Sequence, residues 1–242
     1  MTTIPPARHP RALRVTALTA PWIGALAVLL IGAGLYTALF ASPPDYRQGD
    51  SVRMMYVHVP SAWIGMAAYC LIAVMSALFL LRKSSLASLT AEAAALPGAV
   101  FTFLCLATGS LWGKPMWGVW WSWDARLTSM LILLFLYIGY MALINAFDDR
   151  ERGERAGAIL ALAGAVNIPI IKFSVDWWRT LHQPSSLIRS SGIAIDPAML
   201  RPLLLMVTGF TAFFAALLLL RLHTVILAAT IREARLTADE RD

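Results

Sequence analysis

The stretch MMYVHVPSAWIGMAAYCLIAVMSALFLL, residues 54–81, contains no lysine, arginine, aspartate or glutamate. A helix that crosses the hydrocarbon core of a bilayer, which is about 30 Å thick, needs about 20 mostly apolar residues. The stretch exceeds that length, and it carries a histidine, His58, near its start. We therefore predict a membrane-spanning helix with an imidazole at its mouth.

Five other stretches free of charged residues repeat this pattern: Val15–Pro44, Ala93–Gly113, Leu127–Phe147, Ala156–Ile171 and Pro202–Leu220. The first exceeds the apolar region of a signal peptide and no Ala-x-Ala site closes it, so we expect a retained anchor. The fifth is the shortest; we expect Pro169 to kink it and Lys172 to extend it by snorkelling. The sequence thus predicts one domain, residues 1–242, forming an all-α polytopic membrane protein of about six transmembrane helices.

The composition supports a membrane protein and excludes several other classes. Hydrophobic residues make up 59% of the chain and charged residues 14%, whereas soluble domains are about 25% charged. The 20 lysines and arginines are scattered between apolar stretches, which argues against nucleic-acid binding. The sequence has neither the phosphate-binding loop of an ATPase nor a Cys-x-x-Cys-His site for covalent haem attachment. Cys70 and Cys105 lie in apolar stretches and are interpreted as packing residues.

The distribution of basic residues indicates the orientation in the membrane. Twelve of the 20 lysines and arginines lie in the termini and in the loops 82–92 and 148–155. Because cytoplasmic loops are enriched in basic residues, we expect cytoplasmic termini and outer loops at 41–53, 112–126 and 172–201. The last outer loop suggests an amphipathic segment on the membrane surface, formed by Ile193, Ile195 and Met199.

Tryptophan is concentrated on the predicted outer side. Five of the nine tryptophans fall within residues 112–123, two more are the pair 177–178, and the predicted cytoplasmic loops contain none. An aromatic belt would place tryptophans at both membrane interfaces, so the one-sided gathering favours a rigid platform for a planar ligand. The residues of this platform are Trp112, Trp117, Trp120, Trp121 and Trp123.

Charged residues stand beside the tryptophans at the mouth of the fourth stretch. Asp124 is placed to cap the next helix by accepting N–H groups of its first turn. Arg126 offers a planar fork either to Asp124 or to a carboxylate on a ligand. An anionic ligand would also account for other basic residues on this side, namely Arg53, Lys114, Arg179 and Arg189.

Two of the four histidines, His58 and His182, fall on the predicted outer side. A lone histidine at a helix end is usually an interfacial hydrogen-bonding residue, but two beside a tryptophan platform favour a shared ligand. Neutral imidazole is an axial ligand of haem iron, and the nearby arginines suit the propionates. Zinc fits less well because a closed site needs about four nitrogen or sulfur ligands. No spacing indicates hydrolytic chemistry.

Three segments of the sequence resemble a known family. Residues 112–129, WGKPMWGVWWSWDARLTS, are similar to the tryptophan-rich WWD signature of the haem-handling proteins of cytochrome c maturation. Residues 57–63, VHVPSAW, and 177–184, WWRTLHQP, resemble the two histidine motifs of one branch, the haem exporter protein C (CcmC) family. The motifs are long and occur in the order of the family, and the six-span plan covers nearly the whole chain.

This resemblance implies a haem-binding assembly factor of cytochrome c maturation system I, in the bacterial inner membrane and without classical catalytic activity. It implies haem b held at the periplasmic face, with His58 and His182 as axial ligands of the iron. The platform tryptophans, Asp124 and Arg126 then shape the surface for haem and its chaperone. The implied partners are the haem chaperone CcmE, the ABC-transporter subunits CcmA and CcmB, and the small membrane protein CcmD.

Other functions remain open from the residues alone. A haem permease would place polar groups at broken helices near mid-bilayer, and Asn167 with Pro169 gives the one hint of this. A membrane b-type cytochrome acting on quinones would bury its histidines within facing helices, whereas His58 and His182 are expected at the outer edge. A WWD synthetase that itself attaches haem to apocytochrome would be larger, with further histidines in its spans.

Overall fold

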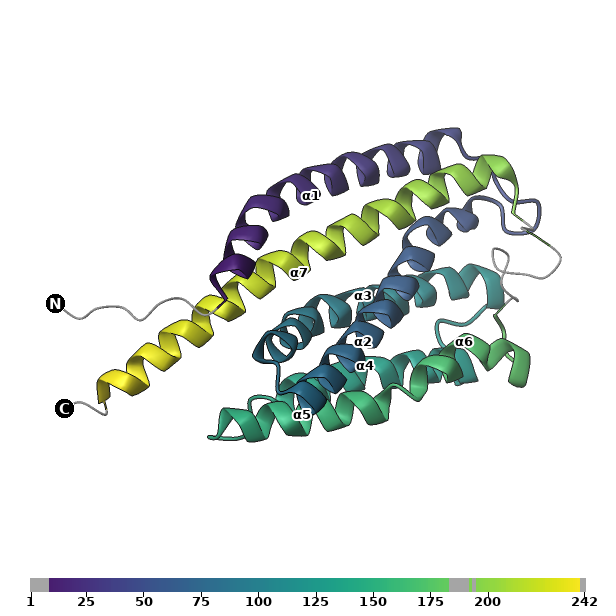
Figure 1. Cartoon of the computed structure of the whole chain (residues 1–242). Helices are drawn as coiled ribbons and strands as arrows, with labels where there is room; N and C mark the ends of the chain where they lie inside the picture. The colour runs from purple at the N-terminus through teal and green to yellow at the C-terminus, as the bar shows by residue number, and fades with distance from the viewer. Residues whose placement is uncertain (1–8, 183–191, 193–194, 240–242) are drawn as a thin grey trace.

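The computed structural model describes residues 9–182, 192 and 195–239, and the regular elements within these ranges are helices (Figure 1). Six helical segments of this part of the chain are long and apolar enough to cross a membrane, α5 and α6 together forming one of them. The predicted all-α polytopic membrane fold is confirmed. The helices are α1 (Pro10–Tyr36), α2 (Met55–Arg82), α3 (Ser85–Trp117), α4 (Ala125–Leu143), α5 (Arg150–Gly164), α6 (Asn167–Trp177) and α7 (Pro197–Asp239).

The helices pack so that the motif-bearing segments gather at one end. α1 lies beside α7 at one edge of the bundle, α7 packs on α2 and α3, and α4, α5 and α6 complete the other side (Figure 1). α1 begins and α7 ends at the same end of the bundle. The α1–α2 connection, the α3–α4 connection and the end of α6 lie at the opposite end.

Several helices extend beyond the apolar stretches that predicted them. α5 begins at Arg150 because the Asp149 side chain accepts the backbone N–H groups of Glu151 and Arg152. The predicted loop 148–155 is therefore mostly helix. α7 is 43 residues long, because arginine and glutamate end an apolar run yet favour helix. The charged residues that bound each apolar stretch mark the expected limit of the membrane-spanning part, whereas the helices themselves continue beyond those residues.

The predicted kink in the fifth span is a break between α5 and α6. Pro169 has no N–H, so it cannot continue the helical ladder to the carbonyl of Ala165. The N–H of Ile168 donates to that carbonyl instead, at 3.1 Å. The buried Asn167 side chain donates its Nδ2 to the carbonyl oxygen of Ser129 on α4, at 2.9 Å. The break is thus held by a bond between helices.

The structure does not show the amphipathic surface segment expected around Ile195 and Met199. Met199 lies in the first turn of α7 and is buried, and Ile195 packs against the apolar cluster that contains Tyr56, Leu203 and Met206. Ile193 lies outside the described residues. Ile195 therefore packs on the bundle itself, and Met199 is a buried residue of α7.

Candidate functional site

The two predicted histidines come together at the end of the bundle that holds the motif-bearing connections. His58 lies in the first turn of α2, and His182 follows α6. They are close enough to interact electrostatically. Trp112 and Trp117, both near the end of α3, stand beside them: the Trp112 ring lies 5.7 Å from that of His58, and the Trp117 ring 5.0 Å from that of His182, both edge-on.

The His58 imidazole is fixed through one of its two nitrogens. Its Nδ1 lies 3.0 Å from the carbonyl oxygen of Cys105 and 3.2 Å from Thr108 Oγ1. Because a carbonyl oxygen only accepts, this bond requires the proton on Nδ1. The Thr108 hydroxyl donates to the carbonyl of Leu104, so it too is available as an acceptor. Nε2 is then the nitrogen whose lone pair is free for a ligand.

Sequence reasoning missed Gly109 as part of this site. A Cβ atom at this position would lie 2.9 Å from Cε1 of His58, which is closer than two carbon atoms can approach. The missing side chain therefore gives the imidazole its place against α3. Within the apolar stretch 93–113 nothing marks this glycine as special, because its role comes from contact with another helix.

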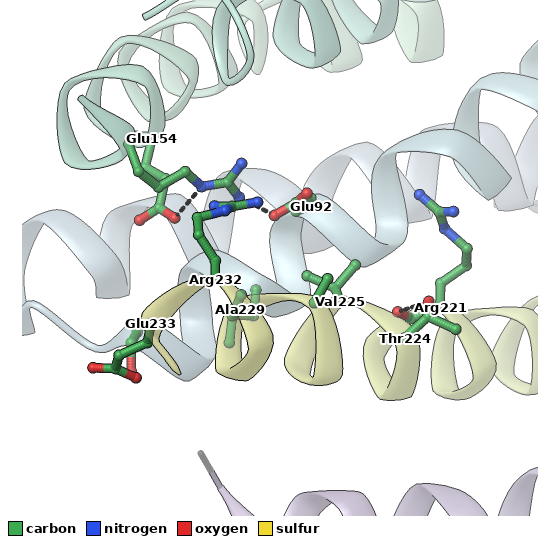
Figure 2. Close-up of a pocket in the computed structure, with 12 residues that line it drawn as sticks. Glu92, Glu154, Arg221, Thr224, Val225, Ala229, Arg232 and Glu233 are labelled. Atoms are coloured by element: carbon green, nitrogen blue, oxygen red, sulfur yellow. Dashed lines mark hydrogen bonds and ion pairs between the residues drawn. The ribbon is translucent and has the colours of Figure 1, made fainter. Parts of the chain in front are cut away.

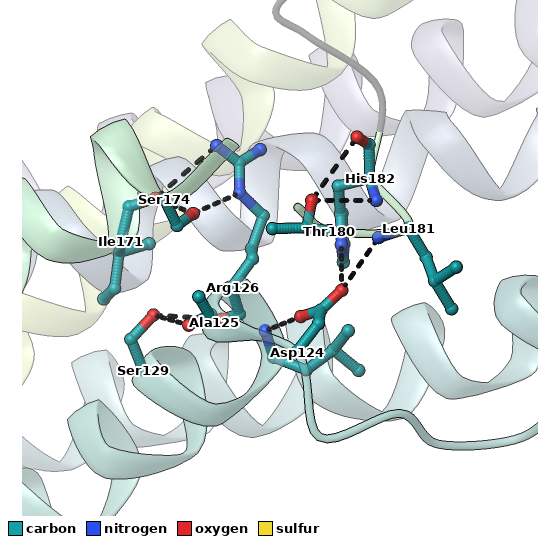
Figure 3. Close-up of polar contacts among 10 residues, drawn as sticks. Asp124, Ala125, Arg126, Ser129, Ile171, Ser174, Thr180, Leu181 and His182 are labelled. Atoms are coloured by element: carbon teal, nitrogen blue, oxygen red, sulfur yellow. Dashed lines mark hydrogen bonds and ion pairs between the residues drawn. The ribbon is translucent and has the colours of Figure 1, made fainter. Parts of the chain in front are cut away.

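Asp124 joins the start of α4 to the segment that carries His182. Its Oδ1 accepts the N–H of Leu127 at 2.8 Å, which is the predicted helix cap. Its Oδ2 accepts the N–H of Leu181 at 3.2 Å and lies 3.5 Å from Nδ1 of His182 (Figure 3). The last distance is too long for a hydrogen bond, and within the described residues Nδ1 of His182 is buried without a hydrogen-bond partner. It faces the carboxylate nevertheless, which again leaves Nε2 free.

The charge of Asp124 matches this arrangement. Burial by itself would raise the pKa of the carboxyl group. The contact with His182 and the backbone N–H groups of Leu127 and Leu181 outweigh burial, so the pKa lies below its ordinary value. The carboxylate is therefore ionised at neutral pH and attracts the N–H of the imidazole.

The platform tryptophans do not share one plane. α3 continues to Trp117 and stops at Gly118, whose φ of 76° provides the left-handed conformation that ends the helix. Trp112 and Trp117 are thus helical residues beside the histidines, and not parts of a loop. Trp121 and Trp123 meet at 77°. Trp120 and Trp123 are exposed, at 55% and 76% of their surface.

Three basic residues at this end bind backbone carbonyls at the ends of helices. Arg126 donates to Ser174 Oγ at 3.1 Å (Figure 3) and to the carbonyl of Lys172 at 3.3 Å, both on α6. Arg53 donates to the carbonyls of Ala38 and Leu39, both at 2.6 Å, in the π-helical turn Thr37–Ala41 that continues α1. Lys114 donates to the carbonyl of Gly118 at 3.0 Å.

These bonds supply a reason for the outer basic residues that needs no ligand. Cations at helix C-termini satisfy carbonyls without intrahelical partners and interact favourably with the helix dipole. Arg126 accordingly pairs with helix-end oxygens rather than extending freely to a ligand. Arg179 is exposed, and Arg189 lies outside the described residues.

The fold and this site together define a class: an all-helical, multi-pass membrane protein with two histidines and flanking tryptophans at one end of its bundle. Residues 4–237 match the family model described as Heme exporter protein C. The chain is 49% identical to the Heme exporter protein C of Bradyrhizobium diazoefficiens, over 98% of this chain and 89% of that relative. The Escherichia coli K12 protein of the same name is 47% identical, over 90% and 88%.

A plant relative extends the comparison beyond bacteria. A putative cytochrome c biosynthesis ccmC-like mitochondrial protein of Marchantia polymorpha is 44% identical, over 82% of this chain and 84% of its own length. The chain belongs to the heme exporter protein C (CcmC) family, as the three sequence motifs predicted.

Proposed function

We propose that this protein binds haem b through Nε2 of His58 and of His182 and presents it to the chaperone CcmE during cytochrome c maturation. Family membership supports the haem-handling part of this role. The observation that carries the site is that Nδ1 of each imidazole already faces an acceptor, the Cys105 carbonyl or the Asp124 carboxylate. Metal-binding histidines usually donate their other N–H in this way.

The residues present fit haem better than a metal ion held by side chains alone. Within the described residues no three His, Cys, Asp or Glu side chains come together as a ligand set. Haem supplies its own four equatorial nitrogens and leaves two axial positions for imidazole. His58 and His182 suit these positions, and Trp112 and Trp117 provide apolar surface beside them.

The exposed tryptophans are assigned to the partner surface. Trp120 and Trp123 are exposed although large aromatic side chains gain from burial. Exposed aromatic side chains next to a site are suited to contact a protein that collects its ligand. In this proposal CcmE docks over Trp120 and Trp123.

The location follows from charge and family. More basic residues lie at the end where α1 begins and α7 ends, and such an excess marks the cytoplasmic side. In this proposal the histidines therefore face the periplasm of a bacterial inner membrane. We assign the family partners CcmA, CcmB and CcmD to the same assembly. Neither open alternative gains support: Asn167, the hint of a permease, is engaged by Ser129, and the histidines lie at one end of the bundle.

Absorption spectra of purified protein loaded with haem test the ligand assignment. His58→Ala and His182→Ala should each weaken haem retention, and the double variant should abolish the bis-histidine spectrum. His223→Ala is the matched control, because His223 lies near the other end of the bundle, where its Nδ1 contacts Thr16. A double variant that keeps the full spectrum would refute the site.

Transfer of haem to purified CcmE tests the partner surface. Changing Trp120 and Trp123 to alanine should slow transfer while haem binding and folding persist. Trp22→Ala is the control, since Trp22 is also exposed but lies on α1. Normal transfer by the Trp120 and Trp123 variants would show that the tryptophans serve another purpose.

A further inference from the structure

A second polar site lies at the end of the bundle opposite the histidines. A cavity of about 500 Å³ opens between the start of α3, the start of α5 and the second half of α7 (Figure 2). Three guanidinium groups line it, from Arg150, Arg221 and Arg232. Nothing in the haem-binding proposal uses these residues.

Arg150 is already satisfied by carboxylates. It donates to Glu92 on α3 and, at 2.8 Å, to Glu154 one turn further along α5. The three side chains are largely buried, with 15% to 26% of their surfaces exposed. One cation thus holds two anions, and this group closes one side of the cavity.

The other two arginines have no such partners. Within the described residues neither Arg221 nor Arg232 forms an ion pair, and Nε of Arg221 is buried without a hydrogen-bond partner. Figure 2 shows Arg232 extending from α7 toward the Glu154 side of the cavity, and Glu233, the next residue of α7, also lines it. A buried donor without an acceptor is costly, so an anionic ligand between these groups would relieve the cost.

The position of the cavity selects the kind of anion. Arg221 directly follows the apolar stretch Pro202–Leu220, so it lies where the last span meets the membrane surface. The remaining wall contains apolar side chains, which are Leu89, Val225, Ala228 and Ala229. A ligand that matches both parts has an anionic head and an apolar body.

We propose that this cavity binds the phosphate headgroup of an anionic membrane phospholipid, with Arg221 and Arg232 as its cationic contacts. Basic pockets between transmembrane helices on the cytoplasmic side are suited to such headgroups. Guanidinium and phosphate form charge-assisted hydrogen bonds, two of them in parallel where geometry allows. Bound lipid would join α7 to α3 and α5 at a place where the bundle leaves a gap. The inference does not rest on the haem site at the other end.

Native mass spectrometry of the full chain in neutral detergent tests the proposal. The protein is titrated with phosphatidylglycerol or phosphatidylcholine, and the lipid that stays bound is counted. We expect one tightly retained phosphatidylglycerol and weaker phosphatidylcholine binding. Arg221→Gln and Arg232→Gln should each lower phosphatidylglycerol affinity about fivefold, the change expected for one basic contact with an anionic lipid surface.

Lys83→Gln is the matched control. Lys83 is exposed and lies at the same end of the bundle, and its substitution removes the same charge. The affinity of the Lys83→Gln protein for phosphatidylglycerol should therefore equal that of the unsubstituted protein. If Lys83→Gln lowered the affinity for phosphatidylglycerol as much as the arginine variants do, the effect would come from general surface charge, and the proposal would be overturned. Displacement of the lipid by millimolar inorganic phosphate would overturn the lipid assignment in favour of a free-anion site. Equal binding of phosphatidylglycerol and phosphatidylcholine would overturn both the lipid assignment and the free-anion site.

Discussion

His58 and His182 present the same free nitrogen, but the structure holds them by different means. His58 sits on a helix, and its Nδ1 faces the backbone of the adjacent helix at Cys105. His182 follows the end of α6, and its Nδ1 faces one side chain, Asp124. A backbone carbonyl moves only if α3 moves, whereas a carboxylate is lost by one substitution. The comparison teaches that the second imidazole depends on a single residue.

Substitution of Asp124 should give the largest effect in this comparison. Asp124→Ala removes the acceptor for Nδ1 of His182 and for the N–H of Leu181, so the imidazole loses its orientation. Haem retention should fall by roughly 10- to 100-fold, as is typical when a partner of a metal-binding histidine is removed. Titration of haem into purified protein, followed by absorbance, measures the change.

The control separates orientation of the imidazole from helix capping. Asp149→Ala removes an aspartate cap from α5 at the other end of the bundle, and each cap contributes about 1 kcal/mol to stability. Both variants should lower thermal stability similarly, while Asp149→Ala leaves haem retention unchanged. Equal haem loss in the two variants would mean that Asp124 acts only as a cap.

Crowding His58 should give an intermediate effect. In Gly109→Ala the new Cβ would lie 2.9 Å from Cε1 of the imidazole, so the ring must shift away from α3. Haem affinity should fall about tenfold, within the usual cost of overpacking a well-filled site. Gly32→Ala on α1 is the control, because a Cβ there meets no atom within 4 Å. Unchanged affinity in Gly109→Ala would show that His58 adapts freely.

Removing one acceptor of His58 should give the smallest effect. Thr108→Val deletes the hydroxyl 3.2 Å from Nδ1 but leaves the carbonyl of Cys105 in place. Haem affinity should fall no more than about threefold, the size of a modest hydrogen bond. Thr19→Val, which loses a similar hydroxyl bond to a carbonyl within α1, is the control. A loss as large as that in Asp124→Ala would contradict the backbone as the main support of His58.

Some of the site could be predicted from the sequence because its residues carry their own signals. The cap role of Asp124 follows from its place before an apolar stretch, and the structure confirms it. The bonds of Arg53 and Arg126 could not be predicted in this way. Both donate to backbone carbonyls 14 to 46 residues away along the chain, and a carbonyl has no sequence signature.

The sequence by itself determined the number of spans, the helical class and the tryptophan- and histidine-bearing segments between the spans. A bilayer imposes length and hydrophobicity on any helix that crosses it, and these properties are local. Only the tertiary structure decided that His58 meets the carbonyl of Cys105 beside Gly109, and that Asp124 reaches His182. It also decided that Arg221 and Arg232 face a shared cavity. Such contacts depend on which helices pack together and at what rotation, and no single stretch of sequence contains that information.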